Sequence, residues 1–196
     1  GMLLANEVSG FGRKLPTYDF GAAKVIVSLG ADFLGTWLST VENAKGYATG
    51  RKIDEKNISM SKHYQFESFL SLTGASADER FTHRPSEEGA VALELLNAVT
   101  GVGESTRPGI KKVAEDLKAN NGAALVVSGS NDKNVQVIVN AINNAIGAYG
   151  KTIDWNKPVN YRQGIDSDFA QLLADMEAGS VGTLLVYGAN PAYHSY

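Results

Sequence analysis

The stretch Val25-Ile26-Val27-Ser28-Leu29-Gly30-Ala31-Asp32 decides the fold of this chain. Its first part is a short, largely β-branched run, which is typical of a strand buried on both faces of a parallel sheet. The glycine, small residue and aspartate that follow suit a tight turn from a strand into a helix. We therefore predict a buried strand over 25–29 that ends in a βα turn.

Similar runs alternate with helical patterns along the rest of the chain. Further strands are predicted over 64–72, 124–127 and 183–187. Helices are predicted over 37–50, 86–99, 108–119, 135–146 and 166–176. Alternation of strands and helices over the whole length indicates parallel β-α-β units. The fold class predicted is α/β, a Rossmann-like three-layer arrangement in which helices cover both faces of a parallel sheet.

Three of these helices carry more specific expectations. In the helix after the first strand, we expect the apolar side chains to form the buried face: Trp37, Val41, Ala44 and Ala48. Ser86 is predicted to be the N-cap of the helix over 86–99. In the last helix, Asp166 is the predicted cap, and the side chains expected to face inward are Phe169, Leu172, Leu173 and Met176.

Composition excludes several classes of protein. The 196 residues are 43% hydrophobic and 20% charged, which is typical of a soluble globular domain. The 18 basic and 21 acidic residues nearly balance and the basic ones are scattered, which argues against a nucleic-acid surface. No apolar run approaches the roughly 20 residues that span a bilayer, so no direct membrane insertion is predicted. The absence of cysteine excludes disulfides and cysteine-ligated clusters within this chain.

The two ends of the sequence indicate a piece of a longer multidomain protein. Gly1 stands ahead of Met2, as a tag-cleavage scar does, and residues 1–17 are interpreted as this scar and a lead-in. Residues 18–196 are predicted to form the α/β domain. The sequence stops only a few residues after the last predicted strand, which is an unusual place for a domain to finish.

Three predicted strands end in the same pattern of glycine, small residue and Asx. The residues are Gly30, Ala31 and Asp32, then Gly129, Ser130 and Asn131, then Gly188, Ala189 and Asn190. Ligands of open parallel sheets bind beyond the carboxyl ends of the strands, and helix N-termini there suit phosphate groups. These turns are candidates for binding an extended phosphate-bearing cofactor. The same residues are also ordinary chemistry for a capped βα turn, and neither a Walker loop nor a GxGxxG motif accompanies them.

The sequence resembles the molybdopterin oxidoreductases of the dimethylsulfoxide-reductase superfamily. The stretches that carry the resemblance are 18–20, 25–37, 70–78, 84–90, 145–152 and 188–193, in the order expected for that family. Within the superfamily, Phe33-Leu34-Gly35-Thr36-Trp37 and Gln65-Phe66-Glu67-Ser68 are most similar to the iron–sulfur subunit of the quinol-oxidising alternative complex III. That subunit has a molybdopterin-oxidoreductase-like domain without molybdenum.

Two departures from the enzymes point to this molybdenum-free branch. Active members have a Pro-Gly-Thr-Asp turn whose acid holds the guanine of the pterin dinucleotide, whereas this chain has Pro85-Ser86-Glu87-Glu88. The strand that in the family ends in Asp-Pro-Arg here ends in Glu67-Ser68-Phe69. Replacing the glycine of the turn removes a permissive backbone position, and the longer acid reaches differently.

The resemblance implies a scaffold domain of a respiratory quinol-oxidising complex, on the periplasmic side of a bacterial inner membrane. It implies other domains and subunits of that complex as partners, iron–sulfur clusters elsewhere in the full-length protein, and no cofactor in this segment. No catalytic or metal-binding residue is predicted here. The candidate cofactor residues, which are vestigial if the segment holds no cofactor, are Gly30, Ala31, Asp32, Glu88, Gly129, Ser130, Asn131, Gly188 and Asn190.

Two other interpretations stay open. The chain can be part of a catalytic molybdopterin oxidoreductase that binds the guanine dinucleotide, or a free-standing nucleotide-binding α/β module. Apart from these, Asp78, Arg80, His83 and Arg84 crowd one polar stretch that resembles an acid–base or anion site. We interpret it as a solvated loop with local ion pairs. The widely spaced histidines, including His63, are interpreted as hydrogen-bonded structural residues.

Overall fold

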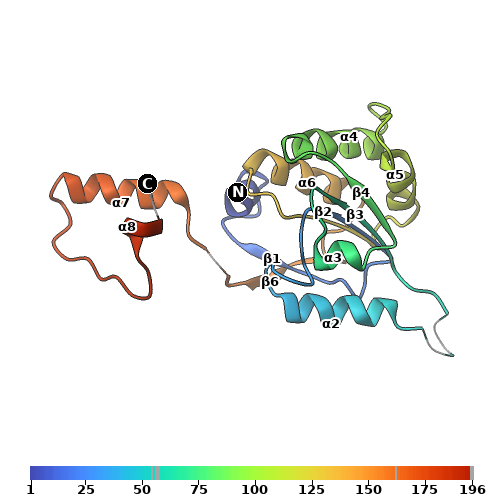
Figure 1. Ribbon diagram of the computed structural model, residues 1–196, viewed down its shortest axis with the longest axis horizontal. Coiled ribbons are helices and arrows are strands. Elements are labelled where there is room, and N and C mark those ends of the chain that lie inside the picture. Colours follow the sequence, from blue (N-terminus) through green and yellow to red (C-terminus); the bar gives the residue numbers. More distant parts are fainter. Residues whose placement is uncertain (54, 56–57, 162, 195–196) are drawn as a thin grey trace. The chain divides into compact units, whose positions relative to one another are not determined.

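The computed structural model describes residues 1–53, 55, 58–161 and 163–194, and it divides into two compact units. Residues 1–161 form the first unit and residues 162–196 the second. The relative placement of the units is not determined, so each is described by itself (Figure 1). The predicted lead-in 1–17 belongs to the first unit, where it contributes helix α1 (Met2–Val8) and the start of strand β1 (Leu15–Tyr18).

A four-stranded parallel sheet forms the centre of the first unit. Its strands are β2 (Val25–Leu29), β3 (Lys62–Glu67), β4 (Glu79–Thr82) and β5 (Ala124–Ser128), in the order β4-β3-β2-β5. From β2 the chain adds β3 and β4 on one side and then returns to place β5 on the other. The strand order therefore reverses between β2 and β5, and such a reversal is the switch point at which open α/β sheets bind ligands.

Helices cover both faces of this sheet, as predicted. α4 (Glu88–Thr100), α5 (Ile110–Ala119) and α6 (Lys133–Ala145) lie on one face, and α2 (Thr40–Arg51) lies on the other (Figure 1). Neighbouring residues of β3 show the two faces, because Tyr64 bonds to Asp116 of α5 whereas His63 contacts Tyr47 of α2. The α/β, Rossmann-like three-layer prediction is confirmed.

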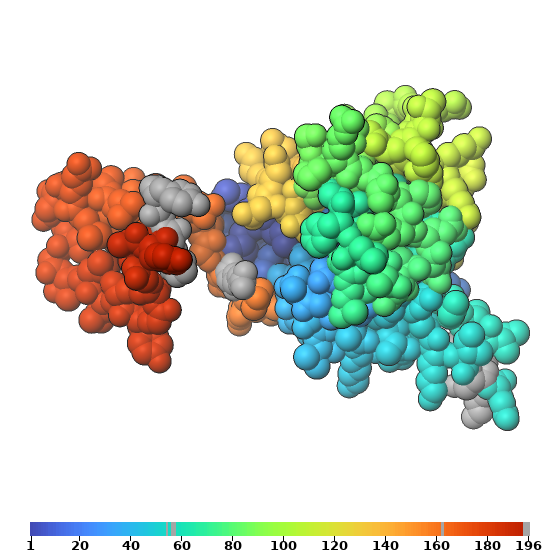
Figure 2. All heavy atoms as spheres, viewed as in Figure 1, coloured from blue at the N-terminus to red at the C-terminus, as the bar shows by residue number. Residues whose placement is uncertain are grey.

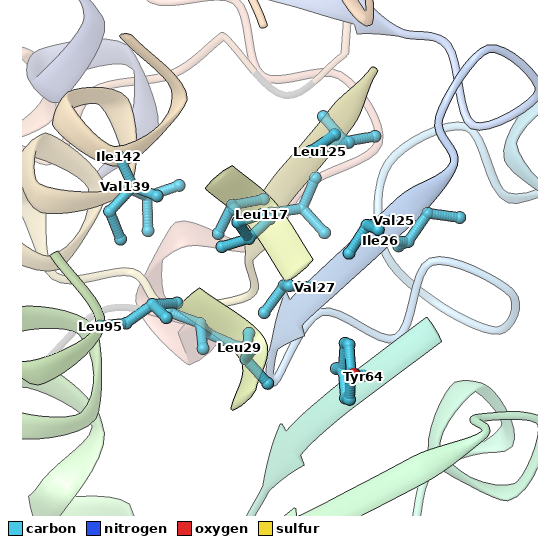
Figure 3. Close-up of a cluster of buried hydrophobic side chains, with 14 of the residues drawn as sticks. Val25, Ile26, Val27, Leu29, Tyr64, Leu95, Leu117, Leu125, Val139 and Ile142 are labelled. Atoms are coloured by element: carbon cyan, nitrogen blue, oxygen red, sulfur yellow. The ribbon is translucent and has the colours of Figure 1, made fainter. Parts of the chain in front are cut away.

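The hydrophobic core lies between the sheet and the helices. All residues of β2 and β5 are buried, which is why both runs are apolar except for Ser28 and Ser128. Side chains of α4 and α6, among them Leu95, Val139 and Ile142, pack with those of β2 and β5 (Figure 3). The strand predicted over 25–29 is confirmed at its full length, and the one over 124–127 extends by one residue to Ser128.

The predicted buried face of this helix is wrong for Val41 and Ala48, which are exposed, whereas Trp37 lies before α2 and packs against the core. Val41 is 85% exposed, and the buried residues of this helix are Asn43 and Tyr47. Gly46 explains the difference: a Cβ at this position would lie 3.3 Å from the backbone nitrogen of Gly21. The helix therefore approaches the segment before β2 through small and polar residues, so its contact face has no apolar pattern to read.

Several short elements were not predicted. β4 lies in the stretch 73–85, where no strand or helix is predicted, and β3 ends at Glu67, before the short helix α3 (Leu72–Ala75). β1 pairs antiparallel with β6 (Ile153–Val159), and neither strand is among the predicted elements. Ser86 is no N-cap, because it lies within a 3₁₀ turn, η1 (Pro85–Glu87), that precedes α4. α5 begins two residues after Pro108, which was expected at the first helical position.

The second unit differs more from the sequence-based expectations. Its helices are α7 (Asp166–Glu177) and α8 (Pro191–His194), and α7 is preceded by Ile165 as N-cap rather than capped by Asp166. No described residue of α7 is buried: Leu173 and Met176 are 48% and 41% exposed. The predicted strand over 183–187 is not formed, and Leu185 and Tyr187 are almost fully exposed. An apolar run forms a strand only where a neighbouring strand pairs with it, and none does among the described residues of this unit.

Among the helices in the described part of the chain, none has the length and apolar character needed to cross a bilayer.

Candidate functional site

Two of the three predicted strand-end turns lie side by side at the switch point. The backbone N–H of Gly129 donates to the carbonyl of Leu29 at 2.9 Å, and so the ladder between β2 and β5 continues into the turns. A Cβ at Gly129 would collide with the carbonyl group of Gly30. Gly30 itself has a φ of +67°, which favours glycine. Gly129 is therefore required by the close approach of the two strand ends, and Gly30 by its left-handed backbone conformation.

The carboxylate of Glu88 lies over this pair of turns. Ser130 donates from Oγ to Oε2 of Glu88 at 2.9 Å, and Oε1 of Glu88 would be 3.6 Å from a Cβ added at Gly30. Glu88 is the first residue of α4 and follows η1, so the sequence positions it between the sheet and the helix layer. The space-filling view shows the segment that contains η1 and α4, in green, at the surface of the first unit (Figure 2). The candidates Gly30, Gly129, Ser130 and Glu88 thus come together.

Asp32 and Ala31 hold the local turn together. Oδ1 of Asp32 accepts hydrogen bonds from the backbone N–H and the hydroxyl of Thr73, at 3.1 and 2.8 Å. Ala31 is fully buried, and its N–H donates to Oγ of Ser28 at 3.0 Å. The carboxylate of Asp32 therefore fastens the turn after β2 to α3, which is a structural role for this candidate.

The N-terminus of α6, next to β5, already has an acidic cap. Asp132 accepts from the backbone N–H groups of Asn134 and Val135 at 2.6 and 3.4 Å. The neighbouring candidate, Asn131, is exposed and accepts a 3.3 Å hydrogen bond from the amino group of Gly1. A phosphate bound at this helix would need the amide donors that Asp132 occupies.

The third predicted turn belongs to the second unit. Gly188 has a φ of +64°, and the carbonyl of Asn190 accepts from the N–H of Tyr193 as α8 begins. Because no strand precedes Gly188, the prediction of a third glycine-bearing strand end is wrong. The reason is that 183–187 has no strand partner within its unit.

A buried polar network under β3 was missed by sequence reasoning. Three alternate residues of this strand, His63, Gln65 and Glu67, face the α2 side and are 0 to 3% exposed. Nε2 of Gln65 donates to Oε2 of Glu67 at 3.0 Å, which turns Oε1 of Gln65 toward Nε2 of His63 at 3.2 Å. Nε2 of His63 therefore carries the proton and Nδ1 is the acceptor.

The hydroxyl of Tyr47 completes this network at the α2 end. Its one proton has two acceptors within reach, Nδ1 of His63 at 3.1 Å and the carbonyl of Ser76 at 2.9 Å. Burial lowers the pKa of His63 to about 4, so the ring is neutral at pH 7. The prediction that His63 is a hydrogen-bonded structural residue is confirmed. The only signal in the sequence was the period-two spacing of three polar residues in one strand.

At its other end the network reaches Arg80 of β4. Oε1 of Glu67 accepts from Nε of Arg80 at 2.5 Å, and Oε2 accepts from Oγ of Ser71 at 2.6 Å. Burial raises the pKa of Glu67, but the hydrogen bonds from Ser71 and Arg80 outweigh it and hold the pKa below its usual range. A Cβ at Gly74 would collide with this carboxylate, so glycine is required there.

A cavity of about 240 Å³ opens at the carboxyl ends of β3 and β4. The residues that line it are Phe66, Arg80, Phe81, Thr82, His83, Arg107 and Pro108. Arg80 and His83 belong to the polar stretch that the sequence favoured as a solvated loop. In the structure, Asp78 of that stretch pairs with Arg51 at 2.7 Å, and Arg84 is exposed outside the lining. The ion pairs of that interpretation are present, but β4 brings Arg80 and His83 to a cavity.

Within the described residues, no three His, Asp or Glu side chains are grouped as a metal site would require. Comparison with known protein families finds no family model that matches this chain, and comparison with curated proteins finds no significant match.

Proposed function

We propose that this chain is a molybdopterin-oxidoreductase-like scaffold domain of a respiratory quinol-oxidising electron-transfer complex, without a cofactor of its own at the switch point. The other subunits of that complex would be its partners, iron–sulfur clusters elsewhere in the full-length protein would carry the electrons, and the periplasmic side of a bacterial inner membrane would be its location. The order of the family-like stretches along the sequence supports this kinship.

The observation that carries the proposal is the position of two carboxylates at the switch point. The carboxylate of Glu88 stands over the two glycine turns, and that of Asp132 occupies the amide donors of α6. A pterin dinucleotide or a nucleotide brings its own negative phosphates to such a place. Glu88 is partly buried, so its repulsion of a phosphate is less screened by solvent, whereas exposed Asp132 competes with a phosphate for the same amide donors; neither residue favours an anionic cofactor. A domain with this edge can still supply shape and interfaces.

The primary test uses the full-length protein that contains this chain. Metal analysis and pterin fluorescence are expected to find neither molybdenum nor tungsten, and electron paramagnetic resonance is expected to detect iron–sulfur clusters. Stoichiometric molybdenum or tungsten would overturn the scaffold proposal in favour of a catalytic subunit. A full-length protein without iron would contradict the placement in an electron-transfer complex.

The strand order itself favours one second candidate, a nucleotide-binding module, because its reversal lies between β2 and β5. Thermal-shift measurements with millimolar guanosine diphosphate and NAD on this chain separate the two. We expect no shift for the unaltered chain and a gain of weak binding for Glu88→Gln. The matched control Glu87→Gln, which removes the same charge from η1, is expected to gain none. A clear shift with the unaltered chain would favour the nucleotide-binding module.

A further inference from the structure

The cavity at the ends of β3 and β4 is separate from the switch point and does not depend on the proposed function. Its floor is apolar: Phe66 and Phe81 stack with ring centroids 5.0 Å apart. A Cβ at Gly109, which has a φ of +83°, would collide with the ring of Phe81. The start of α5 is thereby held against the cavity. An apolar floor lowers the local dielectric constant and strengthens any charge interaction at the rim.

Two arginines that line the cavity, Arg80 and Arg107, are each hydrogen-bonded to a carboxylate. Glu67 binds only Nε of Arg80, and Glu94 binds Nε and Nη2 of Arg107 at 3.3 to 3.4 Å. Nη2 of Arg107 also lies 3.8 Å from Oε1 of Glu87. A guanidinium has five N–H donors. Within the described residues no acceptor is found for Nη1 and Nη2 of Arg80 or for Nη1 of Arg107, and these donors remain for a ligand.

Both supporting carboxylates are themselves fixed. Glu67 is 3% exposed and is held by Ser71 and Gln65. Glu94 accepts from Oγ of Ser105, and this hydrogen bond, opposed by burial and assisted by Arg107, holds the pKa of Glu94 below its usual range. Preorganised arginines lose less side-chain freedom when they bind an oxyanion, which favours binding.

His83 adds a different requirement. Its Nδ1 lies 2.9 Å from the carbonyl of Arg84, and since a carbonyl only accepts, Nδ1 carries the proton. Nε2 of the neutral ring is then an acceptor. This atom is shielded from solvent and has no hydrogen-bond partner among the described residues. Because Nε2 is shielded, a ligand in the cavity reaches it only when the imidazole ring turns toward the cavity. A ligand that then pairs with the neutral ring offers a proton to Nε2 as well as oxygen atoms to the arginines.

We propose that this cavity binds a hydrogen-phosphate group, either as inorganic phosphate or as the end of a small phosphate monoester. Such a group accepts from Arg80 and Arg107 and donates its own O–H to Nε2 of His83. Drug-sized ligands fill pockets of about 300–1,000 Å³, so a cavity of about 240 Å³ suits a small ion better. Sulfate has the same shape but carries no proton near pH 7, so it lacks the donor that His83 requires.

The test is a titration of the 196-residue chain with inorganic phosphate and with sulfate at neutral pH and constant ionic strength, followed by calorimetry. Phosphate is expected to bind with a millimolar dissociation constant, and sulfate about fivefold more weakly, as the loss of one hydrogen bond predicts. Glycerol 3-phosphate distinguishes the two sources, because tighter binding than that of inorganic phosphate assigns the site to a monoester and weaker binding to the free ion.

Three variants make the assignment specific. Arg107→Gln is expected to weaken phosphate binding about tenfold or more, since it removes a charge-assisted donor. His83→Asn keeps a donor where Nδ1 stood but removes Nε2, and it is expected to abolish the preference for phosphate over sulfate. Arg84→Gln removes the same charge from the neighbouring loop outside the cavity, and it is expected to leave phosphate binding unchanged. Circular dichroism and the unfolding midpoint verify that each variant folds.

Two results would overturn the proposal. One is the absence of any heat or stabilisation by phosphate up to tens of millimolar. The other is an equal weakening in Arg107→Gln and Arg84→Gln, which would indicate a general positive field. Equal binding of phosphate and sulfate by the unaltered chain would overturn the role given to His83.

Discussion

Nε of Arg80 donates a 2.5 Å hydrogen bond to Oε1 of Glu67, and this contact joins the ends of two neighbouring parallel strands. The carboxylate is almost fully buried, whereas the arginine side chain is 28% exposed. One ion pair therefore links the polar network under β3 to the cavity at the edge of the sheet.

Glu67→Gln is expected to lower the free energy of unfolding by about 3 kcal/mol, because breaking a buried pair leaves the other partners unsatisfied. Urea denaturation followed by circular dichroism measures the change. Glu79→Gln is the matched control, since Glu79 pairs with Lys112 at the surface and exposed pairs contribute about 1 kcal/mol or less. Equal losses in both variants would contradict a special role for the buried pair.

The buried imidazole of His63 predicts a defined pH dependence. The unfolded chain binds a proton at the ordinary pKa of about 6.5, while the folded chain binds it only near pH 4, so stability is lost as pH falls between these values. The total loss is about 3 kcal/mol, and above pH 7 this residue contributes no slope. Carboxylates whose pKa is lowered by folding, such as that of Asp78, also contribute stability that is lost in acid, but only as the pH falls below their ordinary pKa values.

Denaturation curves at pH 7 and pH 5 check this dependence. His63→Gln retains an amide donor toward Gln65 but has no titrating group, so the difference between the two pH values is expected to shrink. A titration of the His63 ring proton by nuclear magnetic resonance with a midpoint near the ordinary value would contradict the burial described here.

The meeting of the two strand ends at the switch point predicts a severe effect of a single methyl group. Gly129→Ala is expected to cost about 2–3 kcal/mol, because its Cβ would collide with the backbone of Gly30 and force β2 and β5 apart. Gly103→Ala is the control, since the nearest atom to its Cβ is Cβ of Asn97 at 3.8 Å, and we expect a change of less than about 0.5 kcal/mol. Thermal unfolding of the two variants provides the measurement. Similar unfolding midpoints would show that the ends of β2 and β5 leave room for a methyl group at Gly129, which contradicts the close approach described here.

Two substitutions test which face of α2 is buried. Val41→Gln is expected to change stability by less than about 0.5 kcal/mol because Val41 is exposed. Tyr47→Phe is expected to cost about 1–3 kcal/mol, since it removes the hydroxyl that bonds to His63 and Ser76. Chemical denaturation of both variants provides the measurement. A larger loss of stability in Val41→Gln than in Tyr47→Phe would instead support the buried apolar face predicted from the sequence.

The sequence by itself determined the strands that are buried on both faces. β2 and β5 are buried along their whole length and are apolar at every position except Ser28 and Ser128, so the two runs and the glycines that follow them can be recognised in the sequence. The same is true of the helices on the α4 side, whose apolar residues recur at helical spacing. From these alone the α/β class and the proximity of Gly30 and Gly129 could be predicted.

Only the tertiary structure decided where polar residues lie. Nothing local distinguishes Glu88, which covers the switch point, from Glu87, which closes a 3₁₀ turn, because the difference arises from Ser130 far along the chain. The run 183–187 likewise has strand character but no strand, since pairing needs a neighbour and not a propensity. Hydrogen bonds and strand pairs depend on partners brought from distant segments, and that information appears only when the chain has folded.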